Sequence, residues 1–311
     1  MDILIDQRIE LITTIQTLCG YWDNLAEKFL NKKLFQCGYK ENLHQYFEKH
    51  LQNETVTLYK KLCNDERDIS AFLTLILNHS NPPALCKNEY YNDNKYDHFM
   101  ESVRKFYAET GFDSFFKNNK VEYEKIKNDF GYNDRLLNDI NNIFDFLDIE
   151  SKNYNVIISP LVFGNFGINT CTENFVVMSP RDYVNNKYVF GSKEAVRNII
   201  WHEFAHTVIN VLTKKYYDPS KYQNKTIPEI FRKNLYNDME TIVNEYIIRS
   251  IAYLLEKDGN CAKALLDYEK KSGFTKIEKI NNYIFNKCIK NNKLIKSAQY
   301  EKLIDYVVKV I

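Results

Sequence analysis

The segment from Ser192 to Lys215 constrains the fold of this chain more than any other. Its sequence, SKEAVRNIIWHEFAHTVINVLTKK, predicts a single helix of about twenty residues. Ser192 is a typical N-cap, because its hydroxyl oxygen can accept a hydrogen bond from the first turn. Glu194 in the first turn and Lys214 with Lys215 in the last turn have the charges that stabilise the two ends of a helix. We therefore expect one long, capped helix here.

Two histidines and a glutamate in this helix form the pattern HExxH. His202 and His206 are four residues apart, so they project from the same face of a helix. Both imidazoles can then reach one zinc ion, while Glu203 lies beside the metal and can accept a proton from water. The alternative is that both histidines are ordinary core residues of an apolar helix. The capped helix and the short β-rich runs before it favour a zinc site.

The third ligand determines the class of zinc site. The metzincin pattern needs a glycine and a histidine at the positions of Ile209 and Leu212, so that class is excluded. A second apolar helix, predicted over residues 236–257, contains Glu245 in its interior. A buried carboxylate has to be neutralised, paired or coordinated to a metal. We expect Glu245 to be the third zinc ligand.

Other residues of the second helix leave alternatives open. Arg249 lies one turn after Glu245 and is either its simple ion-pair partner or a support for its metal-binding role. Asn237 is the predicted N-cap, with Glu240 three residues later completing a capping box. Glu240 and Asp238 are the alternative metal ligands.

Composition and charge exclude several classes of protein. The chain has 42 Lys+Arg and 41 Asp+Glu, and its net charge of +1 gives no long-range attraction to nucleic acid or to an anionic membrane. No apolar run is long enough to span a membrane, and the start of the chain lacks a signal-peptide core. The 7 cysteines are scattered without a CxxC pair, which indicates reduced thiols. The expected location is the cytoplasm, or outside the cell if a signal peptide has been removed.

The order of predicted elements indicates an α+β fold that is mostly helical. Residues 3–150 have helical periodicity, with breaks near Gly111 and at 78–85. Short β-rich runs follow at 155–170, 173–180 and 187–191, and the pattern is helical again from about residue 192. We expect a helical section over 1–150 and a metal-binding core with C-terminal helices over 151–311, or one continuous domain.

The HEFAH pattern, followed by a helix with NExxxR, resembles the gluzincin branch of the zincin-like metallopeptidases. More closely, the chain resembles a family of bacterial proteins described as a domain of unknown function with a metallopeptidase-type site. The resemblance covers most of the chain to about residue 255 and implies a zincin-like core. Gln7 and Val211 stand where the family usually has proline, and neither is an expected zinc ligand. The resemblance to this family rests on five segments of the chain, which are DQRIELITTIQTLCG, FYAETGFDSFF, VIISPLVFGNFG, HEFAHTVIN and VNEYIIRSI.

The expected function is hydrolysis of a peptide bond in a peptide or protein substrate, with one Zn²⁺ per chain. A metal-activated water molecule would attack the bond, with Glu203 as the general base. Tyr236 and the tyrosines of residues 214–223 are candidate donors to the oxyanion. Residues 161–170 either pair with an extended substrate or contain glycines that only make a bulge.

Two alternatives remain beside the metallopeptidase. The protein could be a zinc-dependent hydrolase of a non-peptide amide, or a catalytically silent zincin scaffold that acts as a binding module. The presence of Glu203 argues against the silent scaffold, because a structural site does not need a general base. The four other histidines stand singly, and we expect them to be surface or core residues: His44, His50, His79 and His98.

Overall fold

The computed structural model describes residues 1–30, 34–65, 70–131, 134–233 and 236–311. The chain divides into two compact units. Unit 1 comprises Met1–Asn133 and Lys152–Gly191, and unit 2 comprises Asp134–Ser151 and Ser192–Ile311. The fold is α+β and mostly helical, as predicted. The predicted domain division at about residue 150 stays a prediction.

Unit 1 contains eight helices within the described ranges: α1 (Gln7–Leu18), α2 (Tyr21–Leu30), α3 (Gly38–Phe47), α4 (Glu54–Asp65), α5 (Ala71–Leu77), α6 (Asp97–Thr110), α7 (Phe112–Asn118) and α8 (Lys120–Phe130). The predicted break at Gly111 is confirmed, since this residue adopts a left-handed conformation with φ of 74° between α6 and α7. The predicted break at 78–85 is also confirmed, because α5 ends at Leu77 and α6 begins at Asp97.

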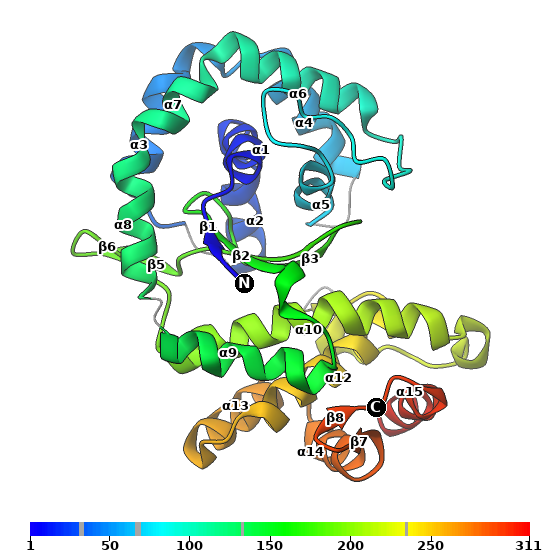
Figure 1. The fold of residues 1–311 in the computed structure, drawn as a ribbon. Helices are drawn as coiled ribbons and strands as arrows, with labels where there is room; N and C mark the ends of the chain where they lie inside the picture. Colours follow the sequence, from blue (N-terminus) through cyan, green and yellow to red (C-terminus); the bar gives the residue numbers. More distant parts are fainter. Residues whose placement is uncertain (31–33, 66–69, 132–133, 234–235) are drawn as a thin grey trace. The chain divides into compact units, whose positions relative to one another are not determined.

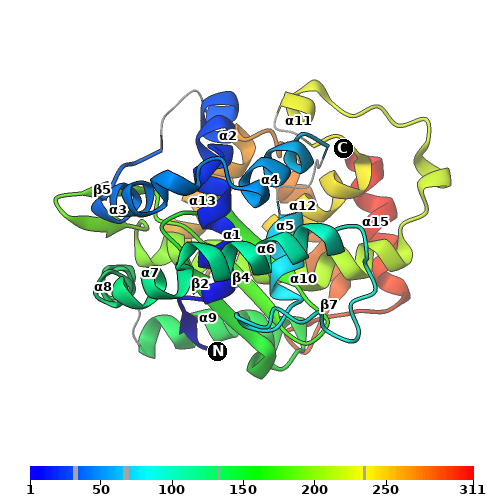
Figure 2. The same ribbon diagram turned by 90° about the horizontal axis from the view of Figure 1, so that it is seen from above.

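Helix α1 is the centre of unit 1. The side chain of Asp6 caps the helix by accepting a hydrogen bond from the backbone of Arg8, and every residue from Ile9 to Leu18 is buried. Helices α2, α3, α4, α5 and α7 all contact it, and both ribbon views show other helices around it (Figures 1 and 2). A helix that is covered on all sides has to satisfy its own polar side chains internally.

A four-stranded sheet completes unit 1, with the order β1-β2-β4-β3. Its strands are β1 (Ile3–Leu4), β2 (Tyr154–Ile158), β3 (Asn165–Asn169) and β4 (Asn174–Met178). The first strand corrects the prediction that residues 3–150 are all helical: Ile3 pairs in parallel with Val156. Strand β3 pairs antiparallel with β4 and forms the opposite edge of the sheet (Figure 1).

The remaining β-rich runs also form strands. The predicted run at 155–170 contains two strands, β2 and β3, instead of one. The predicted strand at 187–191 is β6 (Lys187–Val189), which pairs with β5 (Asp182–Val184) in a separate hairpin. Asn185 and Asn186 turn this hairpin with positive φ angles of 51° and 60°, which is the conformation of a tight two-residue turn.

Unit 2 is built from helices and one small hairpin. Its helices are α9 (Asp134–Leu147), α10 (Lys193–Tyr216), α11 (Glu229–Lys233), α12 (Met239–Leu255), α13 (Gly259–Lys271), α14 (Ile277–Tyr283) and α15 (Ala298–Val310), and its hairpin is β7 (Ile289–Lys290) with β8 (Lys293–Leu294). Helix α10 contacts both α9 and α12. Trp201 of α10 anchors the first contact, because its ring N–H donates to the carbonyl of Ile140 over 3.1 Å. Among the described helices, none is long and apolar enough to cross a membrane.

Candidate metal site

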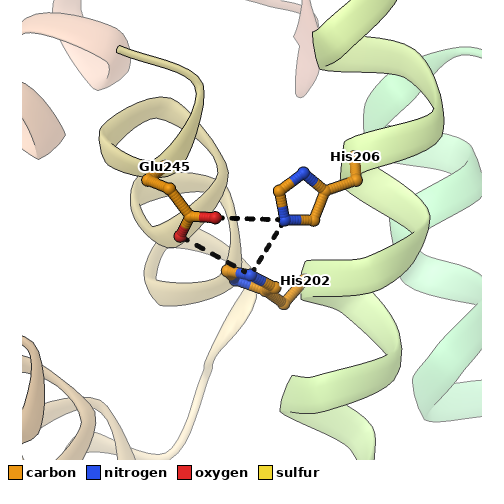
Figure 3. Close-up of side chains that lie close together, drawn as sticks. All are labelled: His202, His206 and Glu245. Atoms are coloured by element: carbon orange, nitrogen blue, oxygen red, sulfur yellow. Dashed lines mark hydrogen bonds and ion pairs between the residues drawn. The ribbon is translucent and has the colours of Figure 1, made fainter. Parts of the chain in front are cut away.

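Helix α10 forms as its sequence predicts. The Oγ atom of Ser192 accepts a hydrogen bond from the backbone N–H of Ala195 over 3.2 Å, and the helix continues to Tyr216. Lys214 and Lys215 lie in the last turn. This continuous helix places the side chains of His202 and His206 on one face, one turn apart (Figure 3).

Helix α12 begins one residue later than predicted. Asp238, and not Asn237, is the N-cap: its carboxylate accepts a hydrogen bond from the backbone N–H of Thr241 over 2.7 Å. Glu240 is then the second residue of the helix, which is too early for the reciprocal bond of a capping box. The predicted capping box is therefore wrong. Asp238 and Glu240 also lie outside the group of residues that could hold a metal ion.

Three side chains converge between α10 and α12. His202, His206 and Glu245 point toward one another, and together they form a group that could hold a metal ion (Figure 3). The two Nε2 atoms are 3.1 Å apart. Oε1 of Glu245 lies 3.4 Å from Nε2 of His206, and Oε2 lies 3.8 Å from Nε2 of His202. The structure thus brings together the three residues that were predicted to bind metal.

Two of these three distances are close to those expected around a tetrahedral ion. Two ligands that each bind zinc at about 2.0–2.1 Å in a tetrahedral site lie about 3.3 Å apart. The 3.1 Å between the two imidazoles and the 3.4 Å between His206 and Glu245 are close to that value. The side chains are 19%, 18% and 9% exposed for His202, His206 and Glu245, so the site is largely shielded from solvent.

The electrostatics of the site depend on one proton. Burial lowers the pKa of His202 to about 3, so its imidazole is neutral at neutral pH. Burial also lowers the pKa of His206, but the hydrogen bond and charge of Glu245 outweigh this effect and raise the pKa to about 9. Glu245 stays ionised, because Arg249 and the two histidines more than offset its burial and lower its pKa. Without a metal, the site therefore holds one proton on His206, among the Nε2 atoms of the two histidines and the carboxylate of Glu245.

Arg249 connects the site to a second buried carboxylate. Its Nε atom donates to Oε2 of Glu245 over 2.9 Å, and its Nη2 atom forms an ion pair with the same oxygen over 2.8 Å. Its Nη1 atom donates to Oε2 of Glu269 on α13 over 2.6 Å, and Nη2 also donates to the hydroxyl oxygen of Tyr236 over 3.2 Å. The structure shows an ion pair between Glu245 and Arg249, and this contact is compatible with both interpretations of Arg249.

Tyr236 lies at the edge of this network. Burial and the nearby Glu245 raise the pKa of Tyr236 to about 12, so the hydroxyl keeps its proton at neutral pH. Because the oxygen accepts a bond from Arg249, the proton can point to another acceptor. Of the other candidate tyrosines, Tyr217 packs against Tyr222, and the hydroxyl of Tyr222 donates to Asp305.

Two residues of the site did not emerge from the sequence. Asn210 lies one turn after His206 on α10, and its Oδ1 atom is 3.3 Å from Nδ1 of His206. The four-residue spacing was a signal that could have identified it. Glu269 had no comparable signal, because it lies on a helix whose other residues are exposed or half-buried.

Comparisons with known proteins support one part of the sequence resemblance, the family described as a domain of unknown function. A family described as "Domain of unknown function (DUF4932)" matches residues 83–300. The chain belongs to this family. The match includes the segments at 106–116 and 156–167, the HEFAH helix and α12, whereas the segment that begins at Asp6 lies outside it. No curated protein and no solved structure matches the chain.

Proposed function

We propose that this protein is a zinc-dependent metallopeptidase of the gluzincin type, with a zincin-like core around α10 and α12. The observation that carries the proposal is the convergence of His202, His206 and Glu245 at distances suited to a tetrahedral ion. Two histidines one turn apart, joined by a glutamate from a second helix, are a ligand set that zinc uses in catalytic sites.

In the proposed reaction, different residues of the site bind the metal and transfer the proton. Zinc bound here would supply a Lewis acid that polarises a substrate carbonyl group and makes water more acidic. His202 offers a lone pair at neutral pH, because burial lowers its pKa to about 3. Glu203, next to His202 on α10, accepts the proton of the attacking water and passes it to the leaving amine. Its charge acts within the site, since it contributes to raising the pKa of His206.

Tyr236 is the proposed donor to the oxyanion. Its hydroxyl is protonated at neutral pH because burial raises its pKa to about 12. The hydrogen bond from Arg249 fixes the oxygen and leaves the hydroxyl proton for a substrate. A donor of this kind stabilises the negative charge that develops on the carbonyl oxygen during attack.

The test compares the unchanged protein with Glu203→Gln. Zinc content is measured by mass spectrometry, and cleavage is measured on a mixed peptide library. We expect about one zinc ion per chain in both proteins and a fall in cleavage rate of about 100- to 10,000-fold in the variant. Glu194→Gln is the matched control, because Glu194 lies on the same helix but in its exposed first turn.

Three results would count against the proposal. Absence of zinc from the unchanged protein after zinc is supplied would reject the metal site. Zinc binding without peptide cleavage would favour a non-peptide amide as substrate or a silent scaffold. Equal cleavage by Glu203→Gln and by the control would reject the role of Glu203.

A further inference from the structure

The two carboxylate oxygens of Glu245 face different partners. Oε2 accepts a hydrogen bond from Nε of Arg249 over 2.9 Å and forms an ion pair with Nη2 of the same arginine over 2.8 Å. Oε1 has no such bond with the arginine and lies 3.4 Å from Nε2 of His206. Because hydrogen bonds to a guanidinium are strong and directional, Oε2 is held away from any role as a close metal ligand. The carboxylate is therefore oriented with Oε1 toward His206, whereas Oε2, which lies 3.8 Å from Nε2 of His202, is engaged by Arg249.

Arg249 is held from its other side. Its Nη1 atom donates to Glu269 over 2.6 Å, and its guanidinium group lies 4.3 Å from the ring centre of Phe274. The side chains of Arg249 and Glu269 are only 15% and 5% exposed. Glu269 is the one buried residue of α13, all of which the structure describes. Burying a charged carboxylate is costly unless the carboxylate is paired. Helix α13 buries a carboxylate only at Glu269, where Arg249 supplies the partner.

The charges of the group favour a cation. Glu245 alone would be balanced by Arg249, and the pair would give a divalent ion little electrostatic attraction. With Glu269, two carboxylates share one guanidinium, so the formal charges of Glu245, Glu269 and Arg249 sum to −1. Glu269 thereby allows Arg249 to orient Glu245 without cancelling the charge that attracts a metal.

We propose that Arg249 and Glu269 are positioning residues that make Glu245 a ligand through Oε1 alone. This inference rests on one part of the proposed function, the binding of a metal ion at this site. It does not require that the protein hydrolyses peptides. A carboxylate that binds through one oxygen, together with two imidazoles, leaves a fourth position of a tetrahedral ion open. A carboxylate free to rotate could bind through both oxygens and fill that position.

The test uses Arg249→Lys and Glu269→Gln in the full chain. Lysine keeps the positive charge but lacks the branched guanidinium that contacts Glu245 and Glu269 at once, and glutamine keeps the shape of Glu269 but removes its charge. We expect zinc affinity to fall about 10- to 100-fold in each variant, measured by competition with a chromophoric chelator. With cobalt(II) in place of zinc, the visible absorption spectrum is expected to change from a four-coordinate to a higher-coordinate form in Arg249→Lys.

The matched control is Glu256→Gln. Glu256 forms a buried ion pair with Arg197 in the same unit, and neither side chain belongs to the candidate metal group. This variant is expected to lower the stability of the metal-free protein while zinc affinity and the cobalt spectrum stay unchanged. Thermal unfolding without metal is measured for all three variants, so that loss of folding is separated from loss of positioning.

Each outcome decides the inference. It is supported if the two variants bind zinc more weakly than the control does and the cobalt spectrum changes. It is overturned if zinc affinity and the spectrum are unchanged, or if the control weakens binding equally. Failure of the unchanged protein to bind zinc overturns it together with the proposed function, whereas zinc binding without peptide cleavage affects only the latter. If one variant does not fold, the other gives the answer.

Discussion

Glu10 is a buried carboxyl group whose replacement should change how stability depends on pH. It lies on α1 with no solvent exposure, and it accepts a hydrogen bond from the hydroxyl of Tyr39 over 2.6 Å. Burial raises the pKa of Glu10 from 4.5 to about 7, against the lowering effect of hydrogen bonds with Ser159 and Tyr39, and the charge of Asp6 raises it further. The perturbation is Glu10→Gln, which keeps the shape and removes the titration.

The sign of the effect follows from proton binding. In the unfolded chain the carboxyl group ionises near pH 4.5, whereas in the folded chain it keeps its proton up to about pH 7. The stability that Glu10 contributes is therefore complete below pH 4.5 and is lost as the pH rises through about 7. At about 1.4 kcal/mol for each pH unit, the loss between about pH 5 and about pH 8 is about 2.5 kcal/mol.

Tryptophan fluorescence can report unit 1 alone. The chain has 2 tryptophans: Trp22 belongs to unit 1, where its ring N–H donates to Gln16 of α1, and Trp201 belongs to unit 2. In a Trp201→Phe background, urea unfolding followed at Trp22 gives the unfolding free energy of the unit that contains Glu10. We expect Glu10→Gln to gain about 2.5 kcal/mol over its parent between about pH 5 and about pH 8.

A matched control is Glu124→Gln on α8, whose side chain is 67% exposed. We expect the unfolding free energy of this variant to change with pH in the same way as that of the parent. The reasoning is refuted if Glu10→Gln also runs parallel to the parent, because the carboxyl group would then ionise at the same pH in the folded and unfolded chains.

Two further changes test other parts of the structure. Asn210→Ala removes the contact with Nδ1 of His206 and is expected to weaken zinc binding about tenfold in calorimetry, whereas equal affinity would show that Asn210 does not orient the ring. Gly111→Ala adds a Cβ atom 2.8 Å from the hydroxyl of Tyr46 at a φ of 74°, and it should lower the unfolding free energy by about 1–2 kcal/mol in thermal denaturation. Gly38→Ala meets no atom within 4 Å and should be nearly neutral, so equal losses in both variants would contradict this explanation.

The parts of the site that were predicted depend on local sequence. The cap at Ser192 and the spacing of His202 and His206 are properties of neighbouring residues on one helix. Glu245 was identified because a carboxylate inside an apolar helix needs a partner. The error at the start of α12 has the same local origin: Asn237 and Asp238 both have good capping side chains, and sequence alone does not distinguish them.

The parts that were missed depend on distant residues. Glu269 is distinguished only by its contact with Arg249, which lies on another helix. Glu10 appears in the sequence as one polar residue among several on α1; its partner Tyr39 comes from α3, and Tyr123, which shares a hydrogen bond with Tyr39, comes from α8. A two-residue strand such as β1 has no periodicity, so nothing in residues 3 and 4 could indicate a sheet.

Strand β1 also has a consequence for synthesis of the chain. Its pairing partner β2 lies about 150 residues later, and the backbone of Asp2 contacts Asn155 and Val156. At a translation rate of roughly 5–20 residues per second, β2 leaves the ribosome about 8–30 s after β1. During that interval strand β1 has no partner strand, and helix α1 gains the helices that cover it only as each of them is synthesised. Folding of unit 1 on the ribosome should therefore finish late, after a period in which its central helix is available to chaperones.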